Sequence, residues 1–145
     1  MDSLTADDFA SLDTAQKDAV LAALFVALIA DGVPEPSEIA AFSAAIAKLP
    51  WGEPIERLQA KMRAVQARLD NATRDEKIAF LDETVPAIPT PLRMRVIETM
   101  VSITAADNVL TRGERGSLGA FIRAFGLTAE QVDVIRARFV GRPTN

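Results

Sequence analysis

The chain has 145 residues, enough for one domain with a single core. It contains no cysteine, histidine or tyrosine, which excludes disulfide frameworks, thiolate metal sites and the side chains that most often move protons in catalysis. Since the usual proton-moving side chains are missing, we expect a protein that is not an enzyme. The net charge is −4, so no basic excess indicates binding to nucleic acid.

Helices are expected over almost the whole length, because capping residues, prolines and glycines mark their ends. No alternating run bounded by hairpin turns indicates a strand. We therefore predict an all-α, single-domain bundle of about seven or eight helices. In chain order, these span residues 5–11, 14–30, 36–48, 54–71, 74–84, 91–106, 112–125 and 129–140.

Several helix starts have the form of a capping box, in which the first side chain accepts from a first-turn amide and the fourth reaches back to the first residue. The predicted boxes are Asp13 with Gln16, Thr73 with Glu76, Thr111 with Glu114, and Thr128 with Gln131. A helix stop is expected at Gly126, which follows Phe125.

The longest apolar run, residues 19–30, is well short of the roughly 20 residues that cross a bilayer. It predicts a buried helix and no membrane insertion. An apolar stripe also follows residues 54–69 and favours packing within the molecule over a dimeric coiled coil. That stripe comprises Ile55, Leu58, Met62, Val65 and Leu69, and the expected shared core comprises Phe25, Leu28, Ile29, Ile97, Val101, Phe121, Ile122 and Phe125.

Charge is distributed unevenly along the chain. Residues 1–52 contain eight acidic residues and two lysines, whereas residues 53–145 contain twelve acidic and fourteen basic residues. The two parts could therefore attract each other. The amino terminus is acidic and lacks the order of a signal peptide, and the lack of cysteine suits a reducing compartment, so we expect a cytoplasmic protein.

One segment of the chain resembles another. Residues 25–46 align without gaps on residues 101–122, and the alignment predicts two helix-turn-helix units related by a pseudo-twofold axis, within repeats of about 14–49 and 91–127. The identical residues are Ala30, Asp31, Val33, Glu38, Ala44 and Ile46 in the first copy and Ala106, Asp107, Val109, Glu114, Ala120 and Ile122 in the second.

Both copies carry a row of small side chains in the second helix of the unit. Ser37, Ala40 and Ser43 correspond to Gly113, Gly116 and Gly119. We expect this face to let another helix approach closely.

The acidic residues of the two turns have two interpretations. In the first, they only end and cap helices, because short acids suit turns and a glutamate in a first helical turn favours the positive helix end. In the second, the twofold axis gathers them into a cluster that binds a hard cation, Ca2+, Mg2+ or Mn2+. The candidate ligands are Asp31, Glu35, Glu38, Asp107 and Glu114.

A helix that ends in Ala-Asp-Gly, a short turn with proline and a glutamate in the next first turn, repeated within the chain, resembles the TerB-like tellurite-resistance family. The resemblance implies an all-α bundle with internal pseudo-twofold symmetry, a bacterial cytoplasmic setting and a role in tellurite or stress response. It also implies that Asp31 and Glu38, with Asp107 and Glu114, contribute to a metal-binding patch.

The second copy departs from this pattern. Thr111 stands where the first copy has Glu35, and Asn108 replaces Gly32. Arginines at positions 112 and 115 flank the second glutamate and would compensate its charge themselves.

Three functional classes follow from the sequence. The first is a non-enzymatic stress-response module that binds a divalent metal ion. The second is a helical adaptor without a metal site, whose partner is another protein of unknown identity, which leaves a homodimer open. The third is a carboxylate-metal hydrolase, which the sequence disfavours because no evident two-metal arrangement is present.

Overall fold

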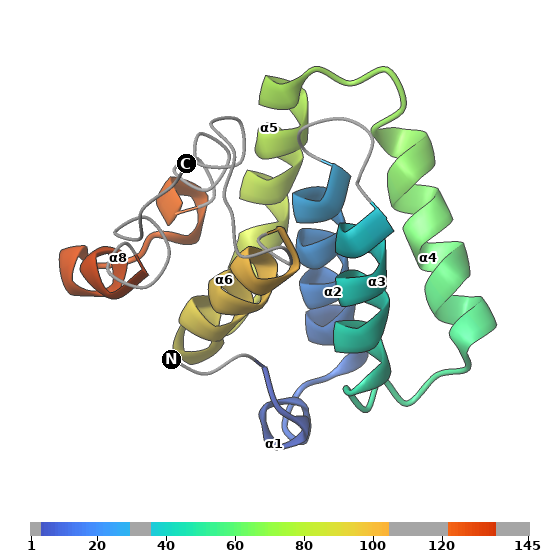
Figure 1. The fold of residues 1–145 in the computed structure, drawn as a ribbon, viewed down its shortest axis with the longest axis horizontal. Helices are drawn as coiled ribbons and strands as arrows, with labels where there is room; N and C mark the ends of the chain where they lie inside the picture. The colour runs from blue at the N-terminus through green and yellow to red at the C-terminus, as the bar shows by residue number, and fades with distance from the viewer. Residues whose placement is uncertain (1–3, 30–35, 105–121, 136–145) are drawn as a thin grey trace.

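All regular structure in the described part of the chain is helical (Figure 1). The computed structural model describes residues 4–29, 36–104 and 122–135. The all-α prediction is confirmed, and the helices pack into one compact bundle. They are α1 (Ala6–Phe9), α2 (Thr14–Ile29), α3 (Pro36–Ala47), α4 (Ile55–Arg68), α5 (Arg74–Thr84), the 3-10 helix η1 (Val85–Ala87), α6 (Thr90–Thr104) and α8 (Ala129–Ile135), and residues 122–125 are also helical.

The helix ends follow local capping chemistry. Asp13 and Gln16 exchange backbone-to-side-chain hydrogen bonds of 2.8 and 2.9 Å, and Thr73 with Glu76 does the same at 3.1 and 3.0 Å. The predicted box at Thr128 and Gln131 is also present. A further box, Thr5 with Asp8, starts α1 and was not predicted. The box expected at Thr111 lies outside the described residues.

The stop at Gly126 is confirmed, with a backbone φ of 65°. The amide of Gly126 donates to the carbonyl of Arg123, and the amide of Leu127 donates to that of Ile122. This pair of bonds is the Schellman arrangement, in which a left-handed residue satisfies the last carbonyls of a helix. Glycine takes this conformation without the steric penalty of a Cβ.

Helix α2 lies at the centre of the bundle and contacts α3, α4, α5, η1 and α6 (Figure 1). Because its sequence is apolar around most of its circumference, it has to be covered on several sides. Val20, Ala23, Leu24 and Val26 are fully buried. No helix in the described ranges is long and apolar enough to cross a membrane.

An aromatic pair closes one end of this core. Phe9 of α1 packs edge-on against Trp51, with ring centroids 4.8 Å apart, and both side chains are buried. The indole Nε1 of Trp51 donates to the carbonyl of Ile46 at 2.9 Å, so the polar edge of the ring is satisfied.

Ion pairs join the acidic first part of the chain to the basic remainder, as the uneven charge distribution indicates. Arg95 of α6 bonds Asp8 at 3.2 Å. Lys61 of α4 contacts Asp18 of α2 at 2.5 Å and, within the second part of the chain, also contacts Glu53 at 2.6 Å. Burial of the ammonium group opposes its charged form, but the hydrogen bonds and charges of the two carboxylates outweigh it and raise the pKa of Lys61 above its ordinary 10.5.

Two expectations about packing faces need correction. Ile55 belongs to the predicted stripe but is 52% exposed, because it is the first residue of α4; Leu58 and Leu69 of that stripe are buried. Ser37, Ala40 and Ser43 were expected to meet another helix, yet all are exposed.

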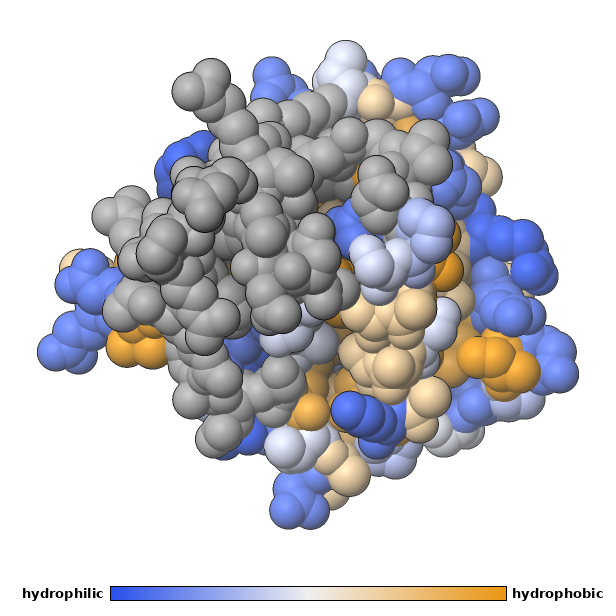
Figure 2. All heavy atoms as spheres, in the orientation of Figure 1, coloured by the Kyte–Doolittle hydropathy of each residue, from blue (hydrophilic) through white to orange (hydrophobic). Residues whose placement is uncertain are grey.

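Helix α3 packs through Phe42 and Ile46 instead. Its exposed side contributes to the pale, weakly hydrophobic region over α3 in Figure 2. Most of the expected shared core is confirmed, although Phe25 and Ile122 are only partly buried and Phe121 lies outside the described residues. Most of the second repeat copy also lies outside them, so the internal repeat remains a prediction.

Phe9 and Phe25 provide a matched test of burial. Phe9 is 1% exposed, so Phe9→Ala should lower the free energy of unfolding by about 3–5 kcal/mol. Phe25 is partly buried and contacts Phe42 edge-on, so Phe25→Ala should cost about half as much. Urea unfolding of both variants checks this order, and an equal or larger loss for Phe25→Ala would contradict the burial described.

Lys61 and Arg57 test the ion-pair network. Lys61→Met leaves two carboxylates facing each other, so we expect a loss of about 1–2 kcal/mol. Arg57 lies one turn earlier and only approaches Glu53 to 3.8 Å from an exposed position, so Arg57→Met should cost under about 0.5 kcal/mol.

The pH dependence of stability gives a second test of Lys61. Because folding raises the pKa of Lys61, its stabilisation is complete below 10.5 and is lost as the pH rises through the higher folded-state value. Chemical unfolding at pH 8 and pH 11 should therefore show a smaller gap between wild type and Lys61→Met at the higher pH. A larger difference in the free energy of unfolding at pH 11 than at pH 8 would contradict a raised pKa of Lys61.

Candidate cation site at the acidic turns

Only one of the five candidate ligands falls in the described part of the chain. Glu38 lies in the first turn of α3, whereas Asp31 and Glu35 belong to residues 30–35 and Asp107 and Glu114 to residues 105–121. The described ranges contain no group of three or more acidic side chains that could hold a metal ion. The predicted cluster therefore remains a prediction.

The helices on either side of residues 30–35 are both held by the core. Helix α2 ends at Ile29, which is buried, and α3 begins at Pro36 and contacts both α2 and α6. The two ends of this segment are therefore fixed by packing. Glu38, on α3, is therefore held by a regular element, which positions a ligand more precisely than a loop does.

Glu38 is half-buried at the third position of α3. Pro36 begins the helix, where its missing amide hydrogen costs nothing. A carboxylate at this position interacts favourably with the positive end of the helix. The position of Glu38 therefore fits the capping interpretation. It is also compatible with the cation-binding interpretation.

Lys77 is a neighbour that sequence reasoning missed. Its Nζ, presented by the first turn of α5, donates to the carbonyl of Ile29 at 3.0 Å. A cation is favourable at this point because the last carbonyls of a helix carry partial negative charge. Asp31 follows Ile29 by only two residues, so a fixed positive charge lies near the start of the first acidic turn.

Glu98 is a second residue that the sequence analysis did not single out. It belongs to α6, the helix that precedes residues 105–121, and only 4% of its surface is exposed. A single acid within the apolar run from Val96 to Val101 is the signal that could have drawn attention to it. A buried carboxylate is costly unless other groups compensate it.

A family model described as tellurite resistance protein TerB matches residues 17–138. The chain belongs to the TerB family. The match includes most of α2, all of α3 and both acidic segments, so the membership agrees with the resemblance seen in the two turns. Comparisons with curated proteins and with solved structures gave no match.

Lys77 and Lys17 give a paired test of the contact at the end of α2. Lys77→Met removes the cation from the helix carboxyl end, and we expect a loss of about 0.3–1 kcal/mol in the free energy of unfolding. Lys17 lies near the amino end of the same helix, where a cation is not favoured, so Lys17→Met should cost nothing. Equal losses in thermal or urea unfolding would contradict this role of Lys77.

Proposed function

We propose that this TerB family member is a non-enzymatic, cytoplasmic module of tellurite resistance or a related stress response, and that its acidic turns bind a divalent cation. The family match over residues 17–138 is the observation that carries the proposal. TerB is not known as an enzyme family, which agrees with a sequence that lacks histidine, cysteine and tyrosine.

The chemistry of the candidate ligands supports a hard cation. Asp31, Glu35, Glu38, Asp107 and Glu114 offer carboxylate oxygens only. Such donors suit Ca2+, Mg2+ or Mn2+ better than zinc or copper, which favour nitrogen and sulfur. The packing of α2 and α3 on either side of the first turn supports a site with little freedom at its ends.

Nearby cations limit how strong this site can be. Lys77 bonds the end of α2, and Arg112 and Arg115 flank Glu114 in the sequence. Positive charges near a carboxylate cluster compete with a metal ion for the same oxygens. We therefore assign the principal role to the first turn, with the second turn as a weaker contributor.

A helical adaptor is the second candidate function, and an open groove favours it. The groove is lined by Phe25 of α2 and by Gln59, Met62, Arg63 and Gln66 of α4. Phe25 and Met62 are partly buried against the core and supply an apolar floor. Arg63 also lines the groove and is exposed, so the fitting partner is an amphipathic helix that carries an acidic residue, from another protein or a second copy.

Thermal melts with each ion distinguish these candidates. If the turns bind a cation, the wild-type stability should rise by about 2.7 kcal/mol when free ion exceeds the dissociation constant a hundredfold. Asp31→Asn and Glu38→Gln should lose this increment. Asp75→Asn is the matched control, because Asp75, like Glu38, is an acid in the first turn of a helix, and it should keep the increment.

The same melts can contradict cation binding. If the wild-type melting temperature is the same with millimolar calcium, magnesium or manganese as with chelator, the acidic turns only cap helices. The adaptor would then be the better account. Modest losses of about 0.5–2 kcal/mol in Asp31→Asn and Glu38→Gln, equal with and without ions, would lead to the same conclusion.

A further inference from the structure

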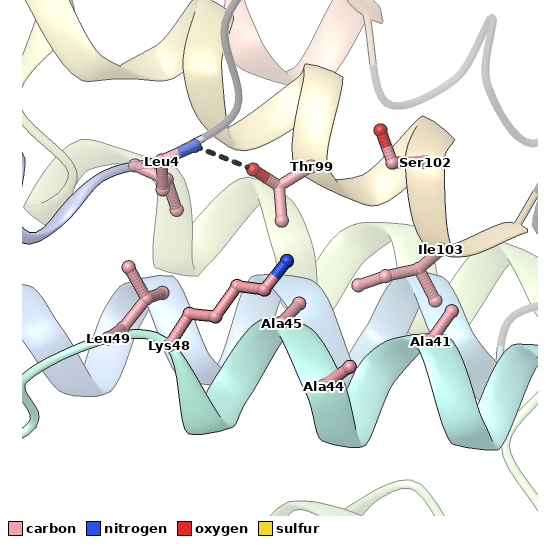
Figure 3. A pocket seen from close by; sticks show the side chains of 9 residues that line it. All are labelled: Leu4, Ala41, Ala44, Ala45, Lys48, Leu49, Thr99, Ser102 and Ile103. Atoms are coloured by element: carbon pink, nitrogen blue, oxygen red, sulfur yellow. Dashed lines mark hydrogen bonds between the residues drawn. The ribbon is translucent and has the colours of Figure 1, made fainter.

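A cleft of about 300 Å³ lies between α3 and α6, and none of the residues that line it is assigned to the cation site (Figure 3). Small side chains of α3, Ala41, Ala44 and Ala45, form one wall. Leu4 and Ile103, both buried side chains, contribute to the rest of the apolar surface. The volume is at the lower end of the roughly 300–1,000 Å³ typical of small-molecule sites.

The hydroxyl groups of this cleft are already committed as donors. Thr99 Oγ1 donates to the carbonyl of Arg95 at 2.9 Å and accepts from the amide of Leu4 at 3.0 Å. Ser102 Oγ donates to the carbonyl of Glu98 at 2.9 Å. Each hydroxyl has a single hydrogen, so neither can donate to a ligand without breaking a bond within the protein.

Lys48 supplies the charge of the cleft. Lys48 directly follows α3, and its side chain extends over Ala45, with Nζ directed toward the side formed by Leu4 and Thr99 (Figure 3). All residues that line the cleft are described, and none of them is acidic. The cleft therefore combines apolar walls with one positive group and no negative one.

We propose that this cleft binds a small amphipathic monoanion, a carboxylate attached to an unbranched alkyl chain. The carboxylate would accept from the ammonium of Lys48, and the alkyl chain would cover Ala41, Ala44 and Ile103, displacing water from apolar surface. Neutral alcohols fit less well because they would leave the ammonium of Lys48 without a counter-charge. The proposal is independent of cation binding at the acidic turns.

Octanoate is the probe, and amide chemical shifts of the full chain are the measurement. We expect saturable shifts at Ala44, Ala45 and Thr99 on addition of octanoate. Hexanoate lacks two methylenes and should bind about fifteenfold more weakly, since each buried methylene contributes about a fourfold change in affinity. Octanol, which has the same chain length without the charge, should also bind more weakly than octanoate.

Two substitutions at accessible positions, each paired with a control, test the assignment. Ala44→Leu fills the cleft and should abolish saturable binding, whereas Ala40→Leu, an exposed position on the same helix outside the cleft, should leave it unchanged. Lys48→Gln should weaken octanoate binding roughly fivefold or more while leaving octanol unaffected. Lys17→Gln removes a lysine elsewhere and should change neither affinity.

The outcomes separate cleanly, provided that each variant retains the wild-type melting profile. Octanoate binding that Ala44→Leu does not alter, or equal affinities for octanoate and octanol in the wild type, would overturn the proposal. Linear shifts without saturation would overturn it as well. Concentration-dependent shifts at the same amides without any ligand would show instead that this face pairs with a second copy.

Discussion

The burial of α2 is the constraint on which the rest of the structure depends. Its sequence is apolar around most of the helix, and Val20, Leu24 and Val26 are fully buried. A helix of this kind is stable only when other helices cover it, and α3, α4, α5 and α6 all contact it. The contact of α5 with α2 also brings Lys77 of α5 within reach of the carbonyl of Ile29.

Features governed by local chemistry could be predicted from the sequence. The capping box of Thr73 and Glu76 involves residues within a single turn, and the left-handed Gly126 satisfies carbonyls of the immediately preceding residues. The direction in which α3 packs could not be predicted in the same way. Most of its side chains are apolar or small, so its pattern does not distinguish Phe42, which is buried, from Ala40, which is exposed.

The neighbours of the candidate sites depend on contacts between distant parts of the chain, which a single sequence does not specify. Spacing identifies Glu38 as a first-turn acid, but nothing in the spacing places Lys77 against the end of α2. The cleft at Lys48 also depends on such distant contacts, since it requires α3 to lie beside α6 with alanines between them. Family membership, by contrast, could be inferred from the motif of the two turns, because it depends on residue identities and not on geometry.

The central claim is that a first acidic turn held between two packed helices binds a hard cation. Line broadening of amide signals by substoichiometric Mn2+ tests it most directly, because the effect is confined to the surroundings of the bound ion. The account predicts selective broadening at Ile29 and Glu38, none at Phe9 or Trp51 at the end closed by the aromatic pair, and loss of the effect in Asp31→Asn. Uniform broadening, or broadening that persists in Asp31→Asn, would contradict it.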